Sequence, residues 1–370
     1  MRNKINSLES LRGIAALSVV LYHFDTESAF NNLFTQNGWL MVDFFFVLSG
    51  FVITLTYSHR LNTAPQYFEF SKRRLLRLYP LHIVTLTGFI CFELAKYVAS
   101  HYFGINASTP PFQGDKTIDA LLPHLLLIHN FVLEDLTWNR PSWSISAEFV
   151  TYLIFGGLML LTTHKSILRA IGVVTIIISA QMTLQVSGMG TSNIDGPARC
   201  FFAFFIGYLT CKLFMKDNSA LNANVAFALL VSSIAVTMYE DLLHDSLRPV
   251  ISLIYAATIY AVARSRPESY LIRVLEMKPL VYLGTISFGV YLWHMLVMYV
   301  ANTIIQLTMR ESVEFVRDTP NGMVLKFDNP AMANLSVIAV VLTSILLATL
   351  SYYIFEKRIA QYGRNSTNKQ

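Results

Sequence analysis

Long apolar runs, separated by short polar connections, recur along the whole chain. Each run holds roughly 17 to 24 residues, and an α-helix needs about 20 apolar residues to cross the hydrocarbon core of a bilayer. The pattern therefore predicts ten transmembrane helices, at residues 8–25, 39–57, 79–99, 142–162, 166–186, 199–215, 223–239, 248–264, 280–303 and 332–355.

Two further segments depart from this pattern. Residues 119–133 are apolar, but they contain one proline and two histidines, and about fifteen residues are too few to cross comfortably. We expect a short re-entrant or interfacial segment there. Between the last two predicted spans, residues 313–327 alternate in polarity around Pro320-Asn321-Gly322, which predicts a small β-hairpin.

Composition and charge identify the class of protein. Hydrophobic residues make up 54% of the 370 residues, charged residues make up 14%, and the mean hydropathy is +0.48, a balance that soluble domains rarely show. With the N-terminus inside and ten crossings, the inner segments hold 20 of the 28 lysines and arginines and the outer segments hold six. Because cytoplasmic loops are enriched in these residues, we predict an all-α polytopic membrane protein with both termini cytoplasmic. Residues 1–356 would form one integral-membrane domain, followed by a short cytoplasmic tail at 357–370.

The first predicted span carries two polar side chains on one face. Arg12 and His23 are eleven residues apart, about three helical turns, so they share a stripe and lie about 16 Å apart along the axis. A histidine at a helix end can simply bond a neighbouring backbone group. Polar groups on one stripe of a membrane helix, however, need partners or a wet cavity, and a neutral imidazole suits general-base catalysis. We take the pair as the axis of a functional site.

A cluster of arginines precedes the third predicted span on its cytoplasmic side. Arg73, Arg74 and Arg77 lie within five residues, and Pro80 after them suits the first turn of a helix. Such a cluster can be an ordinary basic collar of a membrane helix. Guanidinium groups also bind phosphates in a multidentate manner, so a phosphate-bearing donor from the cytoplasm would meet them first. His82 follows about one turn deeper.

Two acidic residues lie near the predicted outer face. Asp43 opens the second span at a depth similar to that of His23, where a carboxylate can orient the imidazole or only face a helix N-terminus. Glu148 sits about two turns into the fourth span, where an unpaired carboxylate is costly. We expect Glu148 to pair with another group or to line a cavity.

Four more residues are candidates for lining a substrate site. Trp143 and Ser144 open the fourth span, where tryptophan is typical of the membrane interface. Tyr291 and His294 are neighbours on one face of the ninth span, three residues apart. Aromatic residues alone would indicate packing, and the histidine makes this face a candidate site.

Several kinds of site have no signature in the sequence. No set of His, Asp or Glu residues has metal-ligand spacing, and the three cysteines lie in apolar surroundings without a Cys-x-x-Cys motif. There is no Walker loop, no Rossmann fingerprint, no Gly-x-Ser-x-Gly and no nucleic-acid module. The sequence therefore predicts no metal site, no bound cofactor and no nucleic-acid partner.

Five blocks, in order along nearly the whole chain, resemble the membrane acyltransferase-3 family, which includes bacterial O-antigen and exopolysaccharide O-acetyltransferases. They are Ser10-Leu-Arg12-Gly13 with Tyr22-His23, Val42-Asp43-Phe-Phe-Phe-Val-Leu-Ser49-Gly50-Phe51, Arg73-Arg74-Leu-Leu-Arg77-Leu-Tyr79-Pro80, Trp143-Ser144-Ile-Ser-Ala-Glu148 and Ser287-Phe-Gly-Val-Tyr291-Leu-Trp-His294.

The resemblance implies roles for particular residues. Arg12 and His23 would be the family's Arg-x10-His pair, with His23 as the catalytic residue. Arg74 and Arg77 would be its Arg-x-x-Arg motif, which helps to hold cytoplasmic acyl-CoA. Many relatives carry an additional C-terminal extracytoplasmic hydrolase-like domain, which we do not expect in this chain. The location implied is the bacterial inner membrane.

The residues and the resemblance lead to one hypothesis. Acetyl-CoA, or another acyl-CoA, would dock at the arginines, and His23 would deprotonate a hydroxyl of a surface polysaccharide, such as lipopolysaccharide, or of a lipid-linked glycan, or would carry the acyl group transiently. Asp43 and Glu148, which fall on acidic motif positions, would tune the imidazole. Two alternatives stay open: a lipid or small-molecule acceptor, and a transporter that passes a small anion or proton along the same stripe without chemistry.

Overall fold

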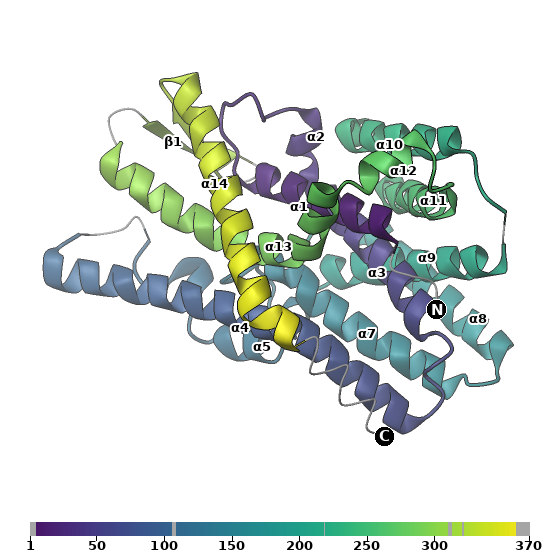
Figure 1. The fold of residues 1–370 in the computed structure, drawn as a ribbon. Coiled ribbons are helices and arrows are strands. Elements are labelled where there is room, and N and C mark those ends of the chain that lie inside the picture. The colour runs from purple at the N-terminus through teal and green to yellow at the C-terminus, as the bar shows by residue number, and fades with distance from the viewer. Residues whose placement is uncertain (1–4, 106–108, 218, 310–312, 320–321, 360–370) are drawn as a thin grey trace.

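The computed structural model describes residues 5–105, 109–217, 219–309, 313–319 and 322–359 (Figure 1). This part of the chain contains fourteen α-helices and one two-stranded sheet. The helices are α1 (Asn6–His23), α2 (Leu33–Gln36), α3 (Met41–Tyr57), α4 (Ala64–Phe103), α5 (Leu121–Leu125), α6 (His129–Val132), α7 (Trp143–Leu161), α8 (Ser166–Ser187), α9 (Asp195–Lys216), α10 (Ala223–Met238), α11 (Ile251–Arg264), α12 (Tyr270–Leu275), α13 (Lys278–Thr308) and α14 (Pro330–Ser351). Short 3-10 turns occur at Gly38–Leu40, Gly114–Lys116, Arg140–Ser142, Glu240–Leu242 and Asp245–Val250, and a π turn at Tyr352–Glu356.

Eight helical stretches in the described residues are long and apolar enough to cross a membrane. Each coincides with one of the ten predicted spans. The other two predicted spans are α1, with 18 residues, and α10, with 16, and neither is among the eight. The all-α fold is confirmed, and the protein is a multi-pass integral membrane protein. The count of ten spans and the side of the membrane on which the termini lie stay predictions.

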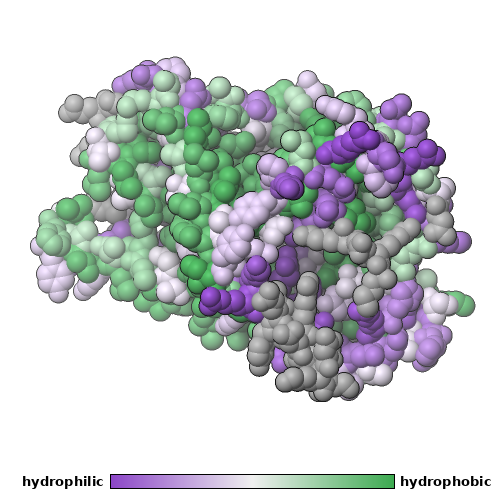
Figure 2. Space-filling model, viewed as in Figure 1, coloured by the Kyte–Doolittle hydropathy of each residue, from purple (hydrophilic) through white to green (hydrophobic). Residues whose placement is uncertain are grey.

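The surface of α14 shows how the bundle meets lipid. Its exposed apolar side chains recur every three or four residues, at Leu335, Ile338, Leu342, Leu346 and Leu350, which is the spacing of one helix face. Figure 2 shows apolar surface across the α14 side of the molecule and polar surface along the upper and lower right edges. An apolar stripe facing outward is stable only where the surroundings are apolar too.

The longest helix, α4, extends past its apolar segment. Its 40 residues are about 60 Å long, roughly twice the hydrocarbon thickness of a bilayer. The first-turn proline is Pro65, and Pro80 lies inside the helix, so the prediction that Pro80 starts a helix is wrong. The apolar run shows only which part of α4 lies in the membrane. The helix itself begins earlier, because its backbone hydrogen bonds continue through the polar segment that carries the arginines. That segment is therefore rigidly joined to the span.

Residues 121–132 form two short helices, α5 and α6, instead of a spanning helix, as the sequence predicted. Between them Leu127 adopts a φ of 55°, a left-handed conformation that is uncommon for leucine. The side chain of Ser146 in α7 holds the turn, because its Oγ donates to the Leu127 carbonyl at 2.9 Å and accepts from the Asn130 N–H at 3.2 Å. The segment is thus folded against the start of α7.

Two helix pairs approach so closely that only glycine fits between them. A Cβ on Gly207 of α9 would lie 2.0 Å from the Val47 carbonyl oxygen of α3, and one on Gly284 of α13 would lie 1.9 Å from the Glu9 oxygen of α1. Real Cβ atoms do not approach backbone oxygens so closely. The pairs α3–α9 and α1–α13 are therefore the close contacts that position the polar residues described below.

The predicted β-hairpin is present. Strands β1 (Val313–Thr319) and β2 (Gly322–Phe327) pair antiparallel, with Val313 opposite Phe327. The turn residues 320–321 lie outside the described residues, as does most of the predicted tail at 357–370. The last described helical segment continues to Ile359, three residues beyond the predicted domain end at 356.

Candidate acyl-transfer site

A large polar cavity lies between α1, α3, α4, α7 and α13. Its volume is about 710 Å³, within the range of small-molecule sites. The α3 residues that line it run from Val42 to Tyr57, a distance of about 23 Å along the helix axis. The cavity therefore extends over much of the thickness of a bilayer core. Glu9 near the start of α1 and Glu356 near the end of the described chain both line it.

Arginines gather at one end of this cavity. Arg60, Arg73, Arg74 and Arg77 all line it, so the predicted arginine cluster is a wall of the cavity. The Arg74 guanidinium donates to the Tyr57 hydroxyl at 3.2 Å and lies over the Tyr57 ring, 5.2 Å from its centroid. The Nε of Arg74 is buried and has no hydrogen-bond partner among the residues that the structure describes. This donor is available to a ligand.

Arg73 differs from its neighbours, because its Nε donates to Glu69 Oε1 at 2.7 Å. Arg77 is exposed to the cavity. Arg77 interacts electrostatically with Glu356, which also lines the cavity, and Arg73 is paired with Glu69 one turn before it. An end with this excess of positive charge is suited to an anionic ligand.

Arg12 and Glu148 line the middle of the cavity. Arg12 forms an ion pair with Glu9 at 3.2 Å and donates from Nε to Ser287 Oγ at 3.1 Å, a contact that the close α1–α13 packing permits. Glu148 accepts a hydrogen bond from the Tyr152 hydroxyl at 2.6 Å. The expectation that Glu148 lines a cavity is met by this geometry, and its Oε1 has a hydroxyl partner.

The far end of the cavity is closed by Tyr291 and Ser144. Their hydroxyl groups lie 2.8 Å apart, and the Tyr291 hydroxyl donates to the Pro141 carbonyl at 2.9 Å. Both residues line the cavity, and their contact with a substrate stays a prediction. Trp143 points elsewhere and packs edge-to-face on Phe46. The tyrosine is thus anchored in place by two contacts.

His23 and His294 lie together behind Tyr291. Their ring centroids are 5.1 Å apart, and the His294 ring is 5.8 Å from that of Tyr291. His23 Nδ1 donates to the Val19 carbonyl at 3.0 Å, and because a carbonyl can only accept, the lone pair of a neutral His23 ring is on Nε2. Neither histidine is among the described residues that line the cavity. Tyr291 therefore links the two regions, because it lines the cavity and packs on His294, which in turn packs on His23.

Asp43 does not orient His23. Both of its carboxylate oxygens bind Arg199 of α9, with Nε to Oδ1 at 3.2 Å and Nη2 to Oδ2 at 2.7 Å. Arg199 lies between the rings of Trp39 and Trp143, 4.9 and 5.2 Å from their centroids. The pair is fully buried, so the expected role of Asp43 at the imidazole is corrected to an ion pair between α3 and α9.

Sequence reasoning missed Arg199, although a signal was present. A single arginine inside an apolar span needs an acidic partner nearby, and Asp43 was the acid near a similar depth. His82 also departs from its predicted place, because it is buried against α5 and α6 and does not line the arginine end among the described residues. The donor-binding expectation for His82 is therefore corrected.

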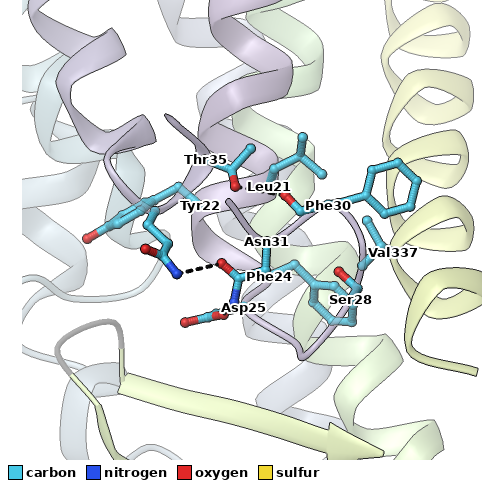
Figure 3. A pocket seen from close by; sticks show the side chains of 10 residues that line it. Leu21, Tyr22, Phe24, Asp25, Ser28, Phe30, Asn31, Thr35 and Val337 are labelled. Carbon is cyan, nitrogen blue, oxygen red and sulfur yellow. Dashed lines mark hydrogen bonds between the residues drawn. The ribbon is translucent and has the colours of Figure 1, made fainter. Parts of the chain in front are cut away.

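A second, much smaller pocket lies beside the end of α1. Figure 3 shows Tyr22 and Asp25 facing Asn31 and Thr35, with Val337 of α14 on the opposite side. Gln36 donates to Asn31 at 2.9 Å across it. Its volume is about 10 Å³, close to the least that holds one water molecule. It is too small for a substrate, so the large cavity is the candidate site.

Comparisons with known proteins agree with this geometry. Residues 5–353 match the family model for the acyltransferase 3 domain. The peptidoglycan O-acetyltransferase OatA of Listeria monocytogenes is 25% identical over 343 residues, covering 83% of this chain and 51% of that protein. The putative peptidoglycan O-acetyltransferase YrhL of Bacillus subtilis is 28% identical over 397 residues, covering 99% and 56%.

A third relative is the acyltransferase MdmB of Streptomyces mycarofaciens, 33% identical over 165 residues, covering 41% of this chain and 38% of that protein. The chain spans about half the length of the curated relatives OatA and YrhL. No solved structure matches it. The family model nevertheless covers almost all of the sequence, and the match includes the arginines, His23 and all the residues that line the cavity except Glu356, Lys357 and Ile359. The chain belongs to the acyltransferase 3 family.

Proposed function

We propose that this protein transfers an acyl group, most simply acetyl, from acyl-CoA on the arginine side of the membrane to a hydroxyl of a cell-surface carbohydrate on the other side. The observation that carries the proposal is the cavity, which leads from four arginines to the tyrosine that stands beside His294 and His23. The names of the relatives, two of them peptidoglycan O-acetyltransferases, support this acceptor class.

The arginine end suits the phosphates of coenzyme A. Guanidinium groups bind phosphate oxygens through paired hydrogen bonds, and the unpartnered Arg74 Nε and the exposed Arg77 supply donors. Acetyl-CoA would be a co-substrate and not a resident cofactor. With the phosphates at the arginines, the acyl arm would lie along α3 toward Ser144 and Tyr291, because the cavity follows that helix.

His23 would act as the general base. Its Nε2 lone pair takes the proton of the acceptor hydroxyl while the hydroxyl oxygen attacks the thioester carbonyl carbon. The new C–O bond forms, the C–S bond breaks, and the coenzyme A thiolate leaves and is protonated. His23 is not among the described residues that line the cavity, so transfer requires the Tyr291 side chain to move aside. Arg12, midway along the cavity, would stabilise the developing charge or hold the donor.

Several classes of acceptor offer the hydroxyl group that this reaction needs. A surface polysaccharide and a lipid-linked glycan present the same hydroxyl chemistry, and a lipid or small molecule would use the same base. The transporter alternative uses the same cavity but consumes no acyl-CoA. Turnover of acyl-CoA therefore separates the enzyme from the transporter before the acceptor is known.

The test is release of free coenzyme A from acetyl-CoA by the purified protein in proteoliposomes, with and without a crude cell-wall glycan acceptor. We expect acceptor-dependent release by the wild type, and a loss of about 100-fold or more in His23→Ala, because a general base contributes on that order. Arg74→Ala/Arg77→Ala should weaken the apparent affinity for acetyl-CoA more than it lowers the maximal rate.

Two controls match these variants. His101→Ala removes an exposed histidine of α4, and Arg273→Ala removes an exposed arginine of α12. Both should behave as the wild type. Full activity of His23→Ala would refute the proposed base. Acceptor uptake or proton flux by the wild type without any release of coenzyme A from several acyl-CoA donors would favour the transporter.

A further inference from the structure

Three histidines that are far apart in the sequence meet in one buried cluster. His82 of α4, His124 of α5 and His129 of α6 are each no more than 5% exposed, and one ring nitrogen from each lies within 4.8 Å of the other two. The rings are nearly parallel, with centroids 3.8 Å apart for His124 and His129 and 5.7 Å apart for His82 and His129. The proposed acyl transfer uses none of them.

Hydrogen bonds determine which nitrogen carries the proton in two of the rings and are compatible with the same tautomer in the third. His82 Nε2 bonds the His124 carbonyl oxygen at 3.0 Å, and His129 Nε2 bonds the Ser142 carbonyl oxygen at 3.0 Å. Because a carbonyl oxygen only accepts, both Nε2 atoms donate, and the lone pair of each neutral ring is on Nδ1. His124 Nε2 bonds Thr137 Oγ1 at 2.8 Å, which allows the same tautomer.

The three Nδ1 atoms are the unexplained feature. All three are buried and lack a hydrogen bond of good geometry in the part of the chain that the structure describes, although the Pro123 carbonyl lies near the His129 ring. A buried polar atom without a partner is costly, and native structures rarely leave one, so three in one cluster require an explanation. A metal-binding histidine typically donates its other ring N–H to a carbonyl or hydroxyl oxygen, which is the arrangement around each of these rings.

We propose that His82, His124 and His129 bind a transition-metal ion of the Zn²⁺ class through their Nδ1 atoms. Imidazole suits zinc, copper, nickel and iron, whereas calcium and magnesium prefer oxygen ligands. Among the described residues no carboxylate belongs to the cluster. A metal ion lies in the plane of each imidazole that binds it, and the three rings here are nearly parallel. Binding therefore requires the rings to rotate out of the stack and the nitrogens to approach to about 3.3 Å, the separation that bond lengths of 2.0–2.1 Å give in a tetrahedral site. Water fills the fourth position.

The ion would fasten the segment 121–132 to the bundle. It links α4 to α5 and α6, and through the Ser142 carbonyl it supports the start of α7. Ser144, two residues further on, contacts Tyr291 at the closed end of the cavity. The metal thus has a structural role, one layer away from the proposed acyl-transfer path, and no reacting group touches it.

This site departs from the expectation of no metal, and the reason is the spacing. His124 lies 42 residues after His82, on a different helix, and the backbone between them includes the end of α4. His124 and His129 are five residues apart on two short helices with a left-handed turn between them. Neither spacing matches a sequence motif for zinc.

The test is the metal content of the whole chain, expressed with added zinc, purified without a polyhistidine tag and washed in metal-free buffer. Inductively coupled plasma mass spectrometry should find about one zinc ion per wild-type chain, and at least tenfold less in His82→Ala/His129→Ala. His101→Ala, which removes an exposed histidine of the same helix α4, should hold the wild-type amount.

A second measurement does not depend on the folding of any variant. Wild-type protein stripped with a chelator and titrated with Co²⁺ should develop the visible absorption bands of a tetrahedral cobalt site. Wild-type chains with less than about a tenth of an ion and no cobalt spectrum would overturn the proposal, and the cluster would then be a metal-free stack. The double variant retaining its zinc would overturn it as well. Neither measurement requires acyl-transfer activity, so the metal site and the proposed acyl transfer are tested independently of each other.

Discussion

Two charged regions inside the bundle contrast sharply. The Asp43–Arg199 pair between α3 and α9 is closed on itself: both carboxylate oxygens are bound, and Nη1 of Arg199 also donates to the Gly190 carbonyl at 3.0 Å. The arginine end of the cavity has a buried Arg74 Nε without a partner in the described residues and an exposed Arg77. Charged side chains that pair with each other stabilise the fold. Arginine side chains with unpaired N–H donors are suited to bind an anionic ligand.

The first prediction concerns the buried Asp43–Arg199 ion pair, where we expect the largest change in the free energy of unfolding. Asp43→Ala leaves a buried guanidinium without its partner and should lower the free energy of unfolding by about 3–5 kcal/mol. Replacing both residues, as in Asp43→Leu/Arg199→Met, should recover most of that loss. Thermal unfolding in detergent measures both.

The exposed pair of Lys326 and Glu27, 3.4 Å apart, is the matched control, and Glu27→Ala should change the free energy of unfolding by no more than about 1 kcal/mol. If Asp43→Ala kept wild-type stability but lost acyl transfer, Asp43 would act in the reaction and the contrast between the two regions would fail.

The second prediction concerns the arginine end of the cavity. Arg77→Ala should leave the unfolding temperature of the ligand-free protein unchanged or slightly higher, because it removes one of several like charges. Acetyl-CoA should raise the unfolding temperature of the wild type by mass action, and it should raise that of Arg77→Ala much less. An equal shift in both proteins would place the donor elsewhere, and Arg273→Ala serves as the control with an arginine removed outside the cavity.

The smallest effect is expected at a surface acid at the end of α9. Hydrogen bonds from the Ser219 backbone N–H, the Tyr260 hydroxyl and the Ser219 hydroxyl lower the pKa of Asp217 from its ordinary value of 3.8 to about 2. A lowered carboxyl pKa stabilises the folded state above about pH 4, and the contribution is lost as the pH falls toward 2.

The unfolding temperature of the wild type should therefore exceed that of Asp217→Asn at about pH 6, and the gap should narrow toward about pH 3. A gap that does not depend on pH would mean that the hydrogen bonds, and not the charge, produce the difference.

Local patterns in the sequence were sufficient for much of this fold. The apolar runs located eight stretches that can span a membrane, and the β-hairpin was predicted because its turn residues and alternation lie within fifteen positions of one another. Arg12 and the arginines in the first half of α4 were found for the same reason: one helix carries each set, and helical geometry gives their relative positions.

The errors about the site residues all involve partners from distant helices. Asp43 and Arg199 are 156 residues apart, and depth in the membrane alone could not tell whether Asp43 pairs with an arginine or with His23. The contact of His23 with His294, 271 residues away, and the meeting of His82 with His124 depend on which helices pack side by side. Close helix–helix approach at Gly207 and Gly284 determines that packing. A glycine in the sequence does not indicate which helix it will contact.

The position of Tyr291 has a consequence for the cell as well as for the reaction. A membrane stores energy as a voltage and a proton gradient, and a water-filled passage through it would dissipate both. The polar cavity extends over much of the bilayer thickness, yet it ends at Tyr291, whose ring packs on Phe45 with centroids 5.9 Å apart and whose hydroxyl is bound to Pro141. We expect Tyr291 and the side chains packed on it to keep the ion permeability of the bundle low, so the acyl group must pass them without opening a continuous path for water.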